Sequence, residues 1–228
     1  FRRVLFRSSA LPNAVFFDAD ALMKLPLYQK KATLLDAFCH AVESSWSVKA
    51  TAESRFYARE AIRLLVANKN AYIDADPELQ CCAYILYAAN LAGRAINISK
   101  TTAGHAMCYK LTSLYGIAHG HAAALCDQVL FPYMITHMAD CIDPRSDAHL
   151  QTVLNGIAMA MGCKTPEQAA KKFSALLTDL ELSVPEVKAS KDIDILKASV
   201  NPDRLKNHPI RLTVKTIETL YKQILNQE

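Results

Sequence analysis

The sequence predicts an all-α fold, on three observations. From about residue 30 onward the apolar residues recur three and four positions apart, and little of the chain alternates as a strand would. Only 6 of the 228 residues are glycine, which disfavours a fold built from many strands and tight turns. Apolar residues make up 51% and charged residues 21%, a balance typical of a globular chain with a core. We therefore expect a multi-helix domain with at most a short strand at its N-terminal end.

The N-terminal end departs from the helical pattern. Residues 12–18 form a short apolar run bounded by Pro12 and Asp18, which predicts a strand leaving an earlier sheet. Residues 18–26 then predict a short helix and a turn. The chain is expected to pass here from one structural unit into the helical one.

The first long helix is expected to begin near residue 30. One face of it carries apolar residues at helical spacing, namely Leu34, Leu35, Phe38, Cys39, Val42 and Trp46. A second helix should follow Thr51, whose hydroxyl suits an N-cap, with Glu53 in its first turn and Phe56 among its apolar positions. Pro77 should open a third helix, because proline is tolerated in a first helical turn.

Five further helices complete the expected fold. The fourth spans about residues 104–114 and ends in a turn at 115–117. The fifth runs from about His119 to Met138 and is bent or ended near Pro132. The last three, with a proline-bracketed loop before the final one, are expected at 147–161, 166–181 and 213–226.

The first eight residues, 1–8, are interpreted as foreign to the protein. The nucleotide string TTC AGA CGT GTG CTC TTC CGA TCT encodes them and looks like the end of a common sequencing-library adapter. They contain three of the 26 basic residues, so 23 basic residues face 22 acidic ones without them, a formal charge of +1. No basic footprint for nucleic acid is left, and no apolar run is long enough to cross a bilayer.

The seven cysteines lack the spacing of a metal finger. Cys39, Cys108 and Cys126 lie in apolar stretches that are expected to be helical. Buried, reduced thiols explain this pattern best and are typical of a reducing compartment. We therefore expect a cytoplasmic protein that associates with neither a membrane nor a nucleic acid.

The segment Asp36-Ala-Phe-Cys-His40 is the strongest local signal for chemistry. On a helix, residues four apart lie on one face, so the carboxylate and the imidazole can chelate one divalent metal ion. Taken alone, such a pair is more often a surface Asp–His contact than a metal site.

Two further histidines, His105 and His119, make a metal site more favourable than a surface contact. His105 follows a small-residue approach to a helix start, and His119 lies at the start of the next helix. They are 14 residues apart, a distance of one helix and one turn, which can bring both side chains to a common point. His119 lies between apolar residues and an alanine-rich run, so if buried it needs a partner, and a metal ion is one such partner.

These residues together resemble the iron-dependent alcohol dehydrogenases. The resemblance is carried by the Asp36–His40 helix followed by Glu43, by His105, and by a His119-Gly-His segment that opens an Ala/Leu-rich helix. It extends from about residue 12 to the C-terminus and includes residues 18–26 and 201–205. Residues 95–113 look like the branch that includes proteins similar to phosphonoacetaldehyde reductases.

The resemblance implies a two-domain protein, with a Rossmann-like nucleotide-binding domain followed by an all-helical metal domain. Residues 9–29 would be the remnant of the first domain and its hinge, and residues 30–228 would be the second. Carried over position by position, the metal ligands are Asp36, His40, His105 and His119. They would bind Fe(II), or equally Zn(II), through a carboxylate oxygen and three neutral ring nitrogens. NAD(H) or NADP(H) would bind through the missing N-terminal domain.

Two departures from the family pattern bear on the function. Many alcohol-oxidising relatives have a further histidine four residues after the third ligand, whereas this chain has Tyr109, which we take as the candidate catalytic residue. Its higher intrinsic pKa puts a simple histidine-like proton relay in doubt. The chain also lacks a glycine-rich phosphate-binding turn. We therefore expect no cofactor-binding residue in this chain.

The expected activity is that of an NAD(P)-linked alcohol dehydrogenase or aldehyde reductase acting on a small aldehyde or alcohol. The metal would act as a Lewis acid on the substrate oxygen during hydride transfer. The chain alone is expected to be inactive, and the full-length enzyme to be a homo-oligomer. The alternatives are a dehydroquinate-synthase-like or polyol dehydrogenase relative and, from another class, a metal-free helical interaction module, in which the four ligand side chains would diverge in space.

The remaining histidines and three basic residues are not predicted to be metal ligands. His121 is expected to be a groove or supporting residue rather than a fifth ligand. The other three histidines are expected at the surface, namely His137, His149 and His208. Three basic residues are candidates to bind an anionic substrate, although solvated side chains are the commoner outcome, namely Arg94, Lys100 and Lys110.

Overall fold

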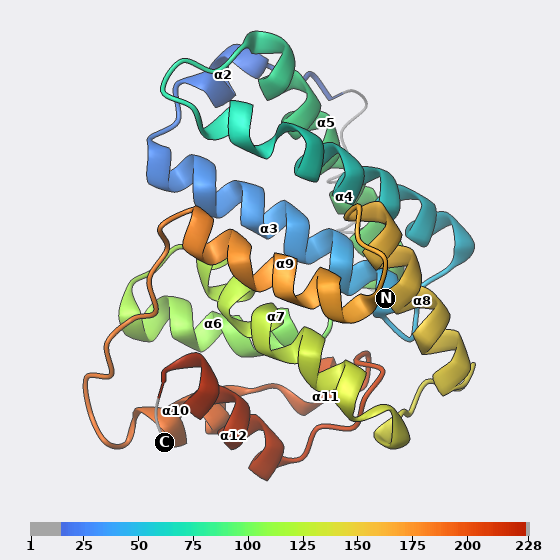
Figure 1. The fold of residues 1–228 in the computed structure, drawn as a ribbon. Coiled ribbons are helices and arrows are strands. Elements are labelled where there is room, and N and C mark those ends of the chain that lie inside the picture. The colour runs from blue at the N-terminus through green and yellow to red at the C-terminus, as the bar shows by residue number, and fades with distance from the viewer. Residues whose placement is uncertain (1–14, 227–228) are drawn as a thin grey trace, which may run out of the picture.

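The computed structural model describes residues 15–226, and the helices of this part pack around one another without a β-sheet (Figure 1). A single antiparallel bridge joins Cys141 to Ile210. The all-α prediction is therefore confirmed. Residues 15–18 form no strand, contrary to the prediction for 12–18, because the described chain offers them no strand to pair with, and Phe16 is 92% exposed. The rest of that segment lies outside the described residues, as do residues 1–8, so the interpretation of 1–8 as foreign stays a prediction.

The predicted short helix after Asp18 is present as α2 (Ala19–Met23). The Asp18 carboxylate caps it by accepting hydrogen bonds from the backbone N–H groups of Asp20 and Ala21. Such a cap satisfies donors that have no partner within the first helical turn.

Helix α3 (Leu27–Trp46) is the central element of the fold. All six residues of its predicted apolar face are at most 1% exposed. It packs against α4 (Ala52–Ile73) and α5 (Leu79–Ser99) on one side and against α7 (His119–Thr136) on the other (Figure 1). Thr51 caps α4 as predicted, within a capping box with Ser54, but Phe56 is 55% exposed rather than packed in the core.

Helices α6 (Ala103–Tyr115) and α7 pack against each other and carry the two later histidines. Gly116 ends α6 in the left-handed conformation, with φ at +72°, which glycine adopts without steric cost. The chain then reverses into α7, whose first residue is His119. Pro132 lies within α7, and the helix continues for four residues beyond it.

The C-terminal third contains the three predicted helices, α8 (Asp147–Ala160), α9 (Pro166–Asp179) and α12 (Val214–Ile224). It also contains short helices that were not predicted, namely η1 (Met138–Asp140), α10 (Asp192–Ser199) and α11 (Pro202–Leu205), the last of which lies in the predicted proline-bracketed loop. These are too short for hydrophobic periodicity to distinguish them. Within the described part of the chain, no helix combines the length and apolar character needed to cross a membrane.

The seven cysteines are free thiols, and five of them are buried, as predicted. Gly120 shows how closely the helices approach one another near the predicted site. A Cβ atom at Gly120 would lie 2.0 Å from the carbonyl oxygen of Ala32 and 2.7 Å from Cβ of Asp36. The first turn of α7 therefore packs directly on the α3 backbone, which holds His119 beside Asp36.

We expect Gly120→Ala to destabilise the chain by about 1–3 kcal/mol, because the added methyl group meets rigid backbone and forces α7 away from α3. Gly93→Ala is the matched control, since a Cβ there meets nothing within 4 Å on the exposed face of α5. That change should stabilise the helix by about 0.5–1 kcal/mol. Urea denaturation of both variants measures the effects, and equal stabilities would contradict the close approach of the two helices.

Candidate metal centre

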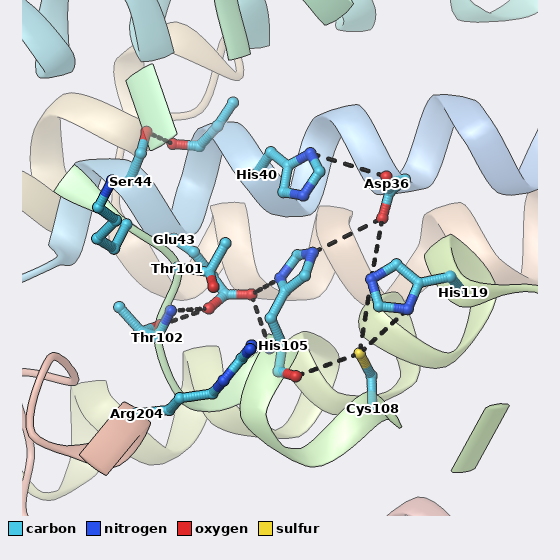
Figure 2. A network of polar contacts seen from close by, with 12 residues as sticks. Asp36, His40, Glu43, Ser44, Thr101, Thr102, His105, Cys108, His119 and Arg204 are labelled. Atoms are coloured by element: carbon cyan, nitrogen blue, oxygen red, sulfur yellow. Dashed lines mark hydrogen bonds and ion pairs between the residues drawn. The ribbon is translucent and has the colours of Figure 1, made fainter. Parts of the chain in front are cut away.

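Four side chains from three helices meet in one region, and they are the four predicted ligands (Figure 2). Asp36 and His40 lie one turn apart on α3. His105 lies in the first turn of α6, and His119 begins α7. The predicted convergence is thus present in the described structure, whereas a metal-free interaction module would have these side chains diverge.

Three contacts radiate from the Asp36 carboxylate. Its Oδ2 lies 3.7 Å from Nδ1 of His40, and its Oδ1 lies 3.6 Å from Nε2 of His105 and 3.8 Å from Nε2 of His119. These distances are longer than hydrogen bonds. Two atoms that each lie about 2.1 Å from one tetrahedral metal ion are about 3.4 Å apart, so the spacing suits a shared cation better than direct pairing.

Two buried atoms at the centre of this cluster lack hydrogen-bond partners within the described structure. They are Oδ1 of Asp36 and Nε2 of His105. Ligand atoms of Asp36, His40 and His105 all lie within 4.8 Å of one another. A divalent cation placed among them would satisfy both orphaned atoms, so these residues fit a metal ion.

His119 is the least enclosed member of the cluster. Its side chain is 36% exposed, and it falls outside the group of three whose ligand atoms lie mutually within 4.8 Å. Its ring nitrogens lie 3.7 and 3.9 Å from Sγ of Cys108. His119 therefore faces the Asp36 carboxylate from the more exposed side of the site.

Glu43 orients the imidazole of His105 through Nδ1, the ring nitrogen that does not face Asp36. It is fully buried on α3 and accepts hydrogen bonds from the backbone N–H groups of Thr102 and His105, from the Thr102 hydroxyl at 2.7 Å, and from Nδ1 of His105. The indole N–H of Trp46 donates to the same hydroxyl at 2.9 Å. Because Nδ1 is engaged with Glu43, Nε2 of His105 faces Asp36, the usual arrangement behind a metal-bound imidazole.

The charges of the cluster favour cation binding. Burial raises the pKa of Asp36, but contact with His105 and the charges of the neighbouring histidines outweigh it, and the pKa lies below its ordinary value. Burial lowers the pKa of His40 and of His119, which favours their neutral, ligating forms. Burial also disfavours charge on His105, but Glu43 and Asp36 outweigh it and raise its pKa well above the usual value. A raised pKa means that His105 holds a proton readily, and a divalent cation bound to Nε2 would replace a proton there.

Asp127 is a buried carboxyl group that was not predicted to belong to the site. It lies on α7, is 0% exposed, and has a pKa raised well above its ordinary value by burial and by Glu43. Burial and the nearby carboxylate of Glu43 therefore favour the neutral form of Asp127. A Cβ at Gly104 would lie 2.1 Å from its Oδ1, so α6 needs glycine there. An acidic residue in the otherwise apolar middle of α7 is the signal that could have found it.

An open pocket of about 420 Å³ lies beside the cluster and is lined by His40, His105, His119 and Tyr109, among others. The hydroxyl of Tyr109 accepts a hydrogen bond from Nη1 of Arg204 at 2.7 Å, and its ring centroid is 5.3 Å from that of His119. The candidate catalytic residue thus lies in the same pocket as three of the predicted ligands.

The remaining histidines lie outside this cluster. His121 is buried, and its Nδ1 lies 3.3 Å from the hydroxyl of Tyr28. His137 and His149 are half-buried. The prediction of a surface position is wrong for His208, which is 0% exposed. Backbone hydrogen bonds of its neighbours explain this, since Asn207 and Pro209 accept from Val48 and Ile142 and hold the segment against the core.

The three basic residues proposed for an anionic substrate lie at different positions relative to the pocket. Arg94 stacks on Tyr57, with its guanidinium carbon 4.0 Å from the ring centroid, and is not among the residues that line the pocket. Lys110 lines a neighbouring pocket together with Tyr109. Lys100 lines the pocket beside the cluster, where two cationic residues that the sequence reading did not name, Lys49 and Arg204, join it.

Comparison with known proteins gives a family match over most of the chain. Residues 30–225 match the family model described as "Fe-containing alcohol dehydrogenase family, C-terminal". The chain is 30% identical over 210 residues to phosphonoacetaldehyde reductase of Streptomyces viridochromogenes, covering 92% of this chain and 53% of that protein.

Solved structures give the same result. The iron-containing alcohol dehydrogenase of Thermotoga maritima is 26% identical with a TM-score of 0.73, covering 92% of this chain and 52% of that one. Sulfoacetaldehyde reductase of Bifidobacterium kashiwanohense, solved with NAD+, has a TM-score of 0.79 over 92% of this chain and 53% of that one, and its 20% identity shows the fold alone. The chain thus spans about half the length of the relatives it matches.

His208 should make the chain acid-sensitive. Burial lowers its pKa from 6.5 to about 4, and both of its ring nitrogens lack partners within the described structure. Between those two pH values the unfolded chain binds the extra proton, so the free energy of unfolding falls as the pH is lowered. The loss at His208 should reach about 3 kcal/mol near pH 4.

His208→Leu should remove this part of the pH dependence, so its stability relative to the parent chain should rise as the pH falls from 7 to 4. Urea denaturation at several pH values measures the difference. Parallel stability curves for the two proteins would show that His208 is not buried in its neutral form.

Proposed function

The chain belongs to the iron-containing alcohol dehydrogenase family, and we propose that it is the metal-binding half of an NAD(P)-linked alcohol dehydrogenase or aldehyde reductase. The family match and the relatives named above support an oxidoreductase. Phosphonoacetaldehyde reductase and sulfoacetaldehyde reductase are named as reductases of aldehydes, and 1,3-propanediol dehydrogenase of Klebsiella pneumoniae as a dehydrogenase of an alcohol, so both directions of the reaction are represented.

The proposed metal ligands are Asp36, His40, His105 and His119. The single observation that carries this assignment is the pair of buried, unpartnered atoms, Oδ1 of Asp36 and Nε2 of His105, facing each other at 3.6 Å. One carboxylate and three imidazoles suit Fe(II) and Zn(II) alike, and Zn(II) generally binds such sites more tightly. Fe(II) is proposed as the working ion because the family is iron-containing.

The bound cation would supply Lewis-acid polarisation of the substrate oxygen. The protein's own residues prepare the site for this. Glu43 fixes the ring of His105, and α7 presents His119 from the pocket side. Tyr109 accepts a hydrogen bond from Arg204, which leaves its own proton available for the substrate oxygen as the alcohol forms. This makes Tyr109 the proposed proton donor in place of the histidine that many relatives have.

NAD(H) or NADP(H) is proposed to bind to a nucleotide-binding domain outside this chain. The relatives are about twice as long as the region they share with this chain, which supports the proposal. The full-length enzyme is further proposed to be a cytoplasmic homo-oligomer. A dehydroquinate-synthase-like or polyol dehydrogenase activity is the second candidate, and it is disfavoured because those relatives generally use fewer histidine ligands than the three that converge here.

Removal of one ligand should weaken metal binding strongly. His40→Ala leaves an incomplete set of donors and should lower the affinity of the chain for Zn(II) or Co(II) by more than about 100-fold, a larger loss than removal of a residue that only hydrogen-bonds to a ligand. His137→Ala removes a histidine outside the cluster and serves as the control. Calorimetric titration of both variants provides the measurement, and equal affinities would refute the ligand assignment.

The chain by itself should lack dehydrogenase activity. Hydride transfer needs the nicotinamide held about 3–3.5 Å from the carbonyl carbon, and the proposed grip on its pyrophosphate lies in another domain. Residues 9–228 and a protein with the nucleotide-binding half restored would be loaded with Fe(II) without oxygen. Aldehyde-dependent oxidation of NADH and NADPH would then be followed for both. Comparable turnover by the shorter protein would contradict the two-domain proposal.

A further inference from the structure

Positive charge surrounds the pocket beside the metal-ligand cluster. Lys49, Lys100 and Arg204 line the same pocket as three of the proposed ligands. Within the described structure none of these three side chains forms an ion pair with a carboxylate. The acidic residue of the lining, Asp203, is already paired with Lys206 at 2.7 Å. Lys100 donates to the carbonyl oxygen of Asn97 at 2.9 Å, so the three positive charges have neutral hydrogen-bond partners at most and no acidic one within the described structure.

Arg204 is aimed at the site rather than at solvent alone. Its guanidinium carbon lies 4.6 Å from the ring centroid of Tyr109, and Nη1 donates to the Tyr109 hydroxyl at 2.7 Å. Figure 2 shows its side chain reaching from the C-terminal segment toward His105. A guanidinium has five N–H donors, so the bond to Tyr109 leaves most of them for a ligand in the pocket.

Lys100 is held in a backbone conformation that favours glycine. Its φ is +63° and its ψ is 169°, a combination that strains any residue with a side chain. The buried amide of Asn207 fixes this conformation by donating to the carbonyl oxygens on either side of it, of Ser99 at 3.0 Å and of Thr101 at 2.8 Å. The protein thus retains a lysine at the pocket edge where a glycine would be relaxed.

We propose that Lys49, Lys100 and Arg204 form a subsite for an oxyanion, so that the enzyme takes aldehydes that carry a phosphonate, sulfonate or carboxylate group. This rests on the proposed function, which places the carbonyl group beside Asp36. Arginine and lysine donors form strong charge-assisted hydrogen bonds with such groups, and a pocket lined by one sign of charge concentrates the opposite one. A phosphate of the nicotinamide cofactor has the same chemistry and is the other source of an oxyanion.

A matched pair of substrates tests the proposal in the full-length holoenzyme. Phosphonoacetaldehyde carries the oxyanion, and tert-butylacetaldehyde is its uncharged isostere. Arg204→Gln should lower kcat/KM for the charged aldehyde about 10- to 100-fold more than for the neutral one, mostly through KM, as expected for loss of one charge-assisted hydrogen bond. Arg94→Gln is the matched control, because Arg94 does not line the pocket, and it should change neither value.

The outcomes separate the competing explanations. Equal losses for the two aldehydes would show that Arg204 acts through Tyr109 alone and would overturn the oxyanion subsite. A rise confined to the KM of NADH or NADPH would assign the cations to the cofactor and would also overturn it. An unmodified enzyme that reduces neither aldehyde would contradict the proposed function, and the binding measurement that follows tests the subsite independently of turnover.

Methylphosphonate, which has no carbonyl group, serves as the binding probe for the chain. Titration followed by 31P NMR should show saturable binding that Arg204→Gln and Lys100→Gly each weaken about 10- to 100-fold and Arg94→Gln does not. Lys100→Gly should leave the melting temperature unchanged or higher, because it removes the strained side chain. Absence of saturable binding by the unmodified chain, or a Lys100→Gly protein that binds the probe normally, would contradict the proposal.

Discussion

The rest of the site depends on the hydrogen bonds that the buried carboxylate of Glu43 accepts. It lies on α3 and binds the N-terminal end of α6, through the backbone N–H groups of Thr102 and His105 and through the imidazole of His105. A buried carboxylate without such partners would be strongly destabilising, so these donors and Glu43 require one another. The result is a fixed junction between two helices that are far apart in the sequence, with His105 locked at the junction.

Close packing extends this junction to the third helix. Gly104 leaves room for the carboxyl group of Asp127 from α7, and Gly120 lets the start of α7 lie against the backbone of α3. Burial and the charge of Glu43 raise the pKa of Asp127, which favours a neutral carboxyl group beside the carboxylate of Glu43. Three helix segments therefore converge on Asp36, and the site is preorganised by core packing rather than by loops. The C-terminal segment completes it by bringing Arg204 over the pocket.

The sequence was most informative where the signal is local. The spacing of Asp36 and His40 on one helix face, the helix starts at His105 and His119, and the apolar face of α3 all follow from helical periodicity, and the structure contains each of them. The role of Glu43 could not be predicted in this way, because its partners lie about sixty residues away.

Tertiary contacts explain why the positions of Arg204 and His208 could not be predicted from the sequence. Lys49 and Arg204 share a pocket only because the segment after α10 returns over α6. His208 lies among polar neighbours in the sequence, yet backbone hydrogen bonds draw its segment into the core. The most direct test of the account is anomalous diffraction from crystals of the chain grown with Zn(II) or Fe(II). The account predicts one metal peak about 2.0–2.2 Å from ligand atoms of Asp36, His40, His105 and His119. A peak elsewhere, or an ordered cluster without a peak, would contradict it.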